Sequence, residues 1–343
     1  MYIALARTIS HSFRDIMSKP SLGLPLSLLL LMVVSMVMGV GATIGECAAV
    51  STSALTRAQG LEAPSVASTY RGEMEGVDFW AEHDELLEEA RKEWGRRHPI
   101  LYEVSEEFMK RFLDPRILHA IGRKSIGMLQ ALFHATEKEG VYTIQVFTSE
   151  FVSLFLDELA YQEASRIPMR RPNGMNRYGC LLSQVGFGSL VETLSDLVFR
   201  PMAHVLFPNR VAAGDISSDY GFVVQYHPDA DTNLAEHADA STVTINVCLQ
   251  PATDAAPLYF KSVRGIRNAD TEVAPTNVSL AAPGMAVVHL GQHVHGVYNV
   301  TSARSNMVVW LMGDNDYVRV APYNTYEVVS NTAAWRSYSG WNE

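Results

Sequence analysis

The chain has 343 residues, of which 48% are hydrophobic and 19% charged, a balance typical of a globular protein with an apolar segment added. A net charge of −10 at pH 7, without any long basic run, argues against nucleic acid as a partner. The three cysteines are too few for a disulfide framework, and the sequence leaves open whether Cys180 and Cys248 pair. The oligomeric state is not determined by these features.

The N-terminal part contains an apolar segment, residues 22–44, that carries no charge and is long enough for a helix across a bilayer. Basic side chains outnumber acidic ones before it, and Glu46 follows it, so the positive-inside rule places the N-terminus in the cytoplasm. We therefore expect a cytoplasmic tail at 1–21, a type II signal anchor at 22–44 and a lumenal C-terminal part in the endoplasmic reticulum or Golgi. A cleaved signal peptide and an organelle-targeting presequence are alternatives.

Two stretches of contrasting composition follow the apolar segment. Residues 45–77 are rich in Ser, Ala, Thr and Gly and lack periodicity, which predicts a flexible stalk. Residues 78–140 twice carry apolar side chains at helical spacing, which predicts amphipathic helices that support the next domain. Asp114 followed by Pro115 is typical of a helix start.

The main predicted domain covers residues 141–321, and residues 322–343 form a C-terminal tail. Its first strand is expected at 141–147, followed by a helix that Thr148 or Ser149 caps. Residues 170–179, here called the polar loop, are rich in turn-forming residues. This loop lines a substrate entrance or is an ordinary connection, and the sequence does not decide between the two. A further amphipathic helix is expected at 189–206.

Short strands dominate the second half of this domain. Residues 241–249 alternate between aliphatic and polar side chains, and apolar runs at 285–290 and 306–312 predict further strands. Glycines at 284 and 291 interrupt the pattern between strands. We therefore expect an α+β fold with a double-stranded β-helix, or jelly roll, preceded by the supporting helices and the transmembrane segment.

A set of potential metal ligands lies within these strands. His237 and Asp239 are two positions apart, so in a strand both side chains point to one face and can bind one metal ion. His295 would come from a distant strand that folds alongside. Two imidazoles and one carboxylate with open coordination positions form the facial triad of non-haem Fe(II) oxygenases. Arg304 then supplies a guanidinium that is suited to a dicarboxylate co-substrate.

These motifs also resemble a known family. FVVQY at 222–226, HADASTVTIN at 237–246 and the ending HVHG…R…VVWL at 293–311 resemble the 2-oxoglutarate and Fe(II)-dependent dioxygenases, in the prolyl and lysyl hydroxylase branch. The first two are similar to the catalytic domain of procollagen lysyl hydroxylases. RPNGMNRYG at 171–179 is more similar to the group called 2-oxoglutarate and iron-dependent oxygenase domain-containing protein 2. The resemblance covers residues 143–313.

The resemblance implies roles for individual residues. His237, Asp239 and His295 match the iron ligands, and Arg304 matches the residue that binds the far carboxylate of 2-oxoglutarate. Tyr226 matches a tyrosine that often lines the co-substrate pocket, although a plain core aromatic is an equal expectation there. His295 is preferred over His293 because its distance to Arg304 suits the family, and His289 is interpreted as a pocket or core histidine. The family often has a glycine pair where this chain has Ala255-Ala256-Pro257, which leaves the geometry of the substrate loop open.

The resemblance further implies Fe(II), 2-oxoglutarate and O2, with ascorbate to keep the iron reduced. The expected reaction is hydroxylation of an unactivated C–H bond on a peptidyl Pro or Lys side chain, with decarboxylation of 2-oxoglutarate to succinate. The same chemistry on a small molecule or lipid is one alternative. A non-catalytic jelly-roll binding module is another.

Overall fold

The computed structural model of the chain describes residues 53–63, 77–208, 211, 216–253, 257–263 and 274–313. The predicted cytoplasmic tail, signal anchor and C-terminal tail lie outside these residues, as do Cys47 and the Ala255-Ala256 pair. Within the described ranges, no helix combines the length and the apolar character that crossing a bilayer requires. The described residues, all of which come from Ser53 onwards, form one compact unit.

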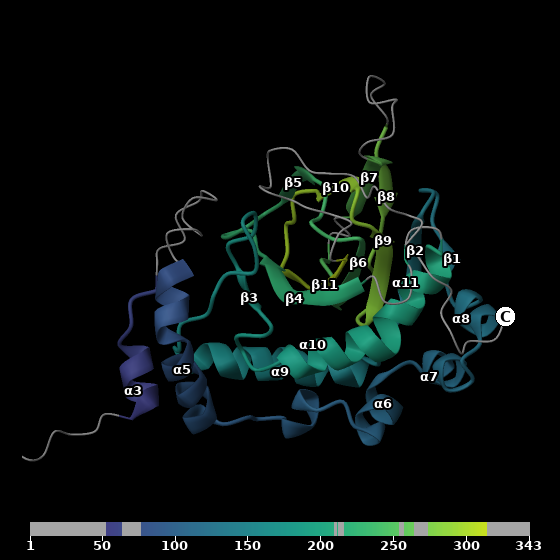
Figure 1. The fold of residues 1–343 in the computed structure, drawn as a ribbon. Coiled ribbons are helices and arrows are strands. Elements are labelled where there is room, and N and C mark those ends of the chain that lie inside the picture. Colours follow the sequence, from purple (N-terminus) through teal and green to yellow (C-terminus); the bar gives the residue numbers. More distant parts are fainter. Residues whose placement is uncertain are drawn as a thin grey trace, which may run out of the picture. The chain divides into compact units, whose positions relative to one another are not determined.

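Two antiparallel sheets form the core of this unit (Figure 1). The larger has the order β1-β2-β9-β6-β11-β4-β3 and the smaller the order β5-β10-β7-β8. The strands are β1 (His134–Ala135), β2 (Val141–Gln145), β3 (Gly179–Leu181), β4 (Ile216–Tyr226), β5 (Leu234–His237), β6 (Val243–Gln250), β7 (Leu258–Val263), β8 (Thr276–Val278), β9 (Met285–Leu290), β10 (His293–Val297) and β11 (Arg304–Gly313). From β4 onwards the chain passes repeatedly between the two sheets, which confirms the predicted jelly roll.

Strand β6 shows how the sequence pattern specifies the two faces of the larger sheet. Val243, Ile245 and Val247 belong to the core between this sheet and the helices. The alternate residues, Thr244 and Asn246, are also buried, but they line a cavity on the other face, between the sheets. A strand buried on both faces normally carries apolar residues throughout. Polar side chains at these inner positions therefore indicate a binding site.

Helices cover the outer face of the larger sheet, with α9 and α10 running beneath β4 and β11 (Figure 1). The helices are α3 (Ala54–Gln59), α5 (Val77–Trp94), the 3-10 helix η1 (Pro99–Tyr102), α6 (Glu106–Phe112), α7 (Pro115–Gly122), α8 (Ile126–Gln130), α9 (Ser149–Ala164), α10 (Gly188–Leu194), the π-helical turn η2 (Ser195–Phe199) and α11 (Arg200–Leu206). Thr148 caps α9 as predicted, since its side chain accepts a hydrogen bond from the Phe151 N–H. Asp114 caps α7 in the same way.

The structure differs from the sequence expectation at two places in the N-terminal half. Residues 54–59 lie in the predicted stalk but form α3, because the Glu93 carboxylate accepts the N–H groups of Ala54 and Leu55 and Ala58 is fully buried. For these residues the prediction of a flexible stalk is wrong. The second helical stretch is divided into α7 and α8, since Lys124 between them adopts a φ of 48° that ends the first helix.

Two of the cysteines lie in the described part of the chain. Cys180 and Cys248 are both buried and both free. The pairing that the sequence left open is therefore absent between these two residues. Burial raises the pKa of the Cys180 thiol to about 12.

Candidate metal centre

The structure brings His237, Asp239 and His295 together at one end of the smaller sheet. His237 is the last residue of β5, and His295 lies directly opposite it on β10. The His237 Nε2 atom is 3.3 Å from Asp239 Oδ1, and the His295 Nε2 atom is 3.8 Å from Asp239 Oδ2. One potential ligand atom from each residue lies within 4.8 Å of the others. Residues 58 positions apart in the sequence thus meet because of the strand register.

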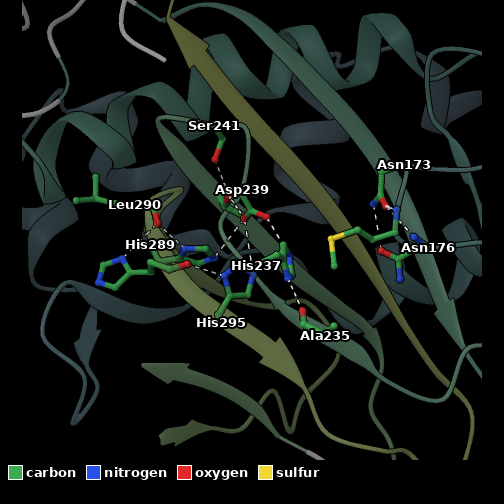
Figure 2. A network of polar contacts seen from close by, with 12 residues as sticks. Asn173, Asn176, Ala235, His237, Asp239, Ser241, His289, Leu290 and His295 are labelled. Carbon is green, nitrogen blue, oxygen red and sulfur yellow. Dashed lines mark hydrogen bonds and ion pairs between the residues drawn. The ribbon is translucent and has the colours of Figure 1, made fainter. Parts of the chain in front are cut away.

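Both imidazoles are oriented by backbone carbonyls. His237 Nδ1 is 2.8 Å from the Ala235 carbonyl oxygen, and His295 Nδ1 is 2.9 Å from that of His293. A carbonyl only accepts, so Nδ1 carries a hydrogen, and Nε2 is the ring nitrogen that faces Asp239 (Figure 2). Burial lowers the pKa of His295 to about 4, so this imidazole is neutral at pH 7. Such a carbonyl-bound, neutral imidazole is the form that binds metals in proteins.

Asp239 is held by its own set of contacts. Its backbone N–H donates to the Gly291 carbonyl at 2.8 Å, and Thr244 Oγ1 donates to Oδ2 at 2.6 Å. Burial raises the pKa of this carboxyl, whereas the charge of His295 and then of His237, when these imidazoles are protonated, lowers it more, so the net direction is down. The side chain is therefore an ionised carboxylate that is 3% exposed. A buried carboxylate requires a compensating positive charge, which a metal cation provides.

The other two histidines of this region occupy different environments. His289 on β9 has Nδ1 at 2.8 Å from the Leu290 carbonyl and Nε2 at 3.9 Å from Asp239 Oδ2. Its imidazole lies beside that of His295 and packs against Phe260. Both ring nitrogens of His293 face backbone carbonyls at 3.2 Å, so this side chain is not directed at Asp239. The geometry thus brings His295 and not His293 to the carboxylate.

The predicted co-substrate residues lie on the larger sheet. Arg304 is the first residue of β11 and pairs with Tyr226, the last residue of β4. Arg304 is 4% exposed and donates from Nε to Asn306 Oδ1 at 3.0 Å, and Asn306 Nδ2 donates to Asn246 Oδ1 at 2.8 Å. Burial raises the pKa of Tyr226 to about 12, so the phenol remains protonated and able to donate.

A cavity extends from the three potential ligands into the space between the sheets. Its polar lining comes from Asn173, Asn176, Tyr226, Thr244 and Asn246. Its remaining lining is apolar and comprises Phe222, Val224, Leu234, Leu258, Val297, Val308 and Trp310. Arg304 itself is not part of this lining. Two residues of the polar loop therefore line the cavity, while a role of the loop at a substrate entrance stays a prediction.

The sequence patterns assign no individual role to Thr244 or to the asparagines of the polar loop. Thr244 stands five positions after Asp239, a separation that neither strand nor helix periodicity connects. The sequence predicts a pocket or core histidine at His289, and its 1% exposure agrees with that prediction. For Asn173 and Asn176 the available signal was the RPNGMNRYG motif itself, in which both stand.

The donor set fits Fe(II). It combines two imidazoles and one carboxylate, all with a fixed orientation, which is the ligand type of non-haem iron sites. Thiolates, which would suit zinc or a cluster, are absent from the only three-residue metal-ligand group found among the described residues.

Known proteins place the chain in a family. Residues 90–212 match the model of the OGFOD2-like domain. The mouse "2-oxoglutarate and iron-dependent oxygenase domain-containing protein 2" is 30% identical over 278 residues, which cover 74% of this chain and 77% of that protein. The chain belongs to the family of 2-oxoglutarate and iron-dependent oxygenase domain-containing proteins. The family predicted from the sequence is thereby confirmed.

Other members of the family match over a smaller share of their length. The human protein of the same name is 34% identical over 223 residues, 62% of each chain. The chain spans 61 to 65% of the length of this protein and of three further relatives. Among solved structures, a Pseudomonas putida prolyl-4-hydroxylase aligns with 54% of this chain and 98% of its own, at 13% identity and a TM-score of 0.37.

Proposed function

We propose that this oxygenase hydroxylates an unactivated C–H bond of a peptidyl Pro or Lys side chain, with decarboxylation of 2-oxoglutarate to succinate. The observation that carries the proposal is that potential ligand atoms of His237, Asp239 and His295 lie within 4.8 Å of one another, beside a cavity that Tyr226 also lines. These three residues would hold Fe(II), which supplies the oxidising chemistry with O2. Ascorbate would keep the iron reduced.

The protein's contribution is orientation and exclusion of water. The carbonyls of Ala235 and His293 fix the two imidazoles, and Thr244 fixes the carboxylate, so little reorganisation is needed when the metal binds. Arg304 is proposed to bind the far carboxylate of 2-oxoglutarate, together with the Tyr226 hydroxyl. The apolar walls of the cavity keep the reacting groups away from bulk water.

An aromatic cluster beside the cavity supports a peptidyl substrate. Trp310 is only partly buried and packs against Phe222 and Tyr220 at ring centroid distances of 5.1 and 5.7 Å. The Tyr220 hydroxyl donates to the Pro172 carbonyl at 2.9 Å, which joins this cluster to the polar loop. A prolyl ring packs on such faces, and a lysyl ammonium is attracted to them.

The proposal is tested by anaerobic binding of Fe(II) and then of 2-oxoglutarate to the full chain, followed by succinate release in air. Wild type should bind both, Asp239→Ala should lose Fe(II), and Arg304→Ala should bind Fe(II) but lose 2-oxoglutarate. Asp229→Ala removes a carboxylate whose side chain is 91% exposed and should behave as wild type. A folded wild-type chain that binds neither ligand would instead support a non-catalytic jelly-roll module. Turnover with small molecules or lipids but no peptide would reject the peptidyl substrate.

We further propose that residues 22–44 anchor the chain in a membrane of the secretory pathway, with the oxygenase domain in the lumen. The support is the sequence alone, namely an uncharged apolar segment with basic residues before it. Asn277 in β8 is exposed and lies in a glycosylation sequon, so it serves as a reporter. A glycan that is lost in Asn277→Gln, on a chain that resists carbonate extraction, is expected. Release of an unglycosylated chain by carbonate would reject the proposal.

A further inference from the structure

Two chains of hydrogen-bonded side-chain amides, here called relays, lead to the cavity. Each relay begins at a group that can only donate a hydrogen bond, and this fixes which end of every following amide donates and which accepts. The first relay runs through Asn173 and Asn176 of the polar loop to Tyr226. The second runs from Arg304 through Asn306 to Asn246. Both end in residues that line the cavity. Their polarity determines which chemical groups the cavity can bind.

The first relay begins at backbone N–H groups. The N–H groups of Met175 and Asn176 each donate to Asn173 Oδ1 at 2.8 Å, so the other end of the Asn173 amide must be the donor Nδ2. That Nδ2 donates to Asn176 Oδ1 at 3.1 Å, as Figure 2 shows. The remaining end of Asn176, Nδ2, donates to the Tyr226 hydroxyl oxygen at 3.3 Å. The phenol oxygen therefore accepts within the protein, and its hydrogen is directed to a different acceptor.

The second relay has the same polarity. Arg304 Nε can only donate, so the atom of Asn306 that it contacts is the acceptor Oδ1. Asn306 Nδ2 then donates to Asn246 Oδ1, which leaves the donor Nδ2 as the remaining end of Asn246. Both lining residues thus offer hydrogen-bond donors. Groups that offer only donors bind an acceptor-only group, and a carboxylate is such a group.

The polar loop is held firmly enough to maintain the first relay. Asn176 is 2% exposed, and the neighbouring Arg177 donates from its backbone N–H and its Nε to the carboxylate of Asp231, at 2.6 and 2.8 Å. The Tyr178 carbonyl accepts from the Gln225 N–H, next to Tyr226 on β4. The loop and the tyrosine are therefore one connected unit.

We propose that Asn173 and Asn176 are positioning residues that make Tyr226 an obligate donor to the far carboxylate of the co-substrate. The affinity for that carboxylate is then controlled by a loop that follows α9 and not only by the strands of the jelly roll. The inference rests on the proposed function, because it takes 2-oxoglutarate as the ligand of the cavity. It adds two residues, and a direction of hydrogen bonding, to the predicted Tyr226 and Arg304.

Asn173→Asp reverses the relay with minimal change in shape. A carboxylate at this position still accepts from the two backbone N–H groups, but its second oxygen can no longer donate to Asn176. The Asn176 amide must then turn, so that Oδ1 faces Tyr226 and takes the phenol hydrogen. The loss of a hydrogen bond to a charged group lowers affinity by about tenfold or more.

The experiment measures binding of Mn(II) and then of 2-oxoglutarate by calorimetry, on the full chain and its variants, with thermal unfolding as a check of folding. In the wild-type background, Asn173→Asp should lower the affinity for 2-oxoglutarate at least about tenfold. In the Tyr226→Phe background, where no phenol hydrogen exists, the same substitution should lower that affinity less than about twofold. Mn(II) affinity should not change. Binding of 2-oxopentanoate, which lacks the far carboxylate, should not respond to Asn173→Asp. Asn176→Ala, which removes the relay without adding charge, should also weaken 2-oxoglutarate.

The outcomes separate this inference from the proposed function. If Asn173→Asp lowers the affinity for 2-oxoglutarate equally in the wild-type and Tyr226→Phe backgrounds, repulsion between negative charges explains the loss and the relay is overturned. No loss from Asn173→Asp or Asn176→Ala in a folded chain that binds 2-oxoglutarate would overturn it as well, while the proposed function would stand. A wild-type chain that binds Mn(II) but not 2-oxoglutarate would overturn both.

Discussion

The hydrogen bond from Thr244 to Asp239 offers a sharp test of how the carboxylate is held. Thr244→Val keeps the branched shape of the side chain but removes the hydroxyl that donates to Oδ2 at 2.6 Å. Thr244 is 1% exposed, so water does not readily replace the lost donor. We expect the variant to fold and to bind metal more weakly.

The magnitude follows from the nature of this contact. A short hydrogen bond to a buried carboxylate contributes about 1.5–3 kcal/mol. At about 1.4 kcal/mol per tenfold change, its loss corresponds to a decrease of about 10–150-fold in metal affinity. Partners of metal ligands typically contribute about 10–100-fold, which is the same range. Part of the effect will appear as lower stability of the metal-bound chain, since metal binding stabilises the fold.

The assay is an anaerobic Fe(II) or Mn(II) titration, and the matched control is Thr242→Val. Thr242 is also buried, at 5% exposure, but its hydroxyl has no hydrogen-bond partner among the described residues. Its replacement should leave metal affinity unchanged and should not destabilise the fold. A change of less than about threefold in Thr244→Val, or an equal loss in the control, would refute the role assigned to the hydroxyl.

Three further predictions concern the co-substrate, the packing and a thiol. Arg304→Lys should lower the affinity for 2-oxoglutarate, measured by calorimetry, at least about tenfold because the bidentate pair is lost. The control Arg116→Lys, on the exposed surface, should leave this affinity unchanged. Equal affinities of the two variants would exclude Arg304 from the site. Gly291→Ala should destabilise the fold by more than about 2 kcal/mol in denaturant unfolding, since its Cβ would stand 2.0 Å from the Ser241 carbonyl oxygen; an unchanged midpoint would contradict this. Native Cys180, with its pKa raised to about 12 by burial, should label very slowly at pH 8 and faster as pH rises or the chain unfolds; rapid labelling of this residue in the native chain, read by peptide mass spectrometry, would contradict it.

The fold was predictable where local periodicity and buried faces agree. Strand β6 could be predicted because its aliphatic residues alternate with polar ones, and the structure assigns those two sets to the helix-covered face and to the cavity. The break at Gly291 was also predictable, because glycine ends the apolar run. Its consequence is that β9 and β10 belong to different sheets. Helix α3 was not predictable, since it depends on Glu93, a residue 39 positions away from Ala54.

For the candidate site, too, one part was predictable from the sequence and another part was not. The grouping of His237, Asp239 and His295 was predicted from spacing and resemblance, but the expected strand through both His237 and Asp239 is wrong, because β5 ends at His237 and Asp239 lies beyond it. The roles of Thr244 and of Asn176 required the tertiary structure. Asn176 meets Tyr226 across 50 positions of sequence, and only the folded polar loop brings the amide to the phenol. A polar loop can be recognised from its composition, but the direction of its hydrogen bonds cannot.

The two predicted histidine ligands and the predicted co-substrate residues belong to opposite layers of the sandwich. His237 and His295 lie on the smaller sheet, and Tyr226 and Arg304 lie on the larger one. Sheets packed face to face stand about 10 Å apart. A molecule that binds at both places joins the two layers, so its carbon chain must have the length that this separation allows. Dicarboxylic 2-oxo acids one carbon shorter or longer would leave one end unbound, and the thickness of the fold would then be the basis of co-substrate selectivity.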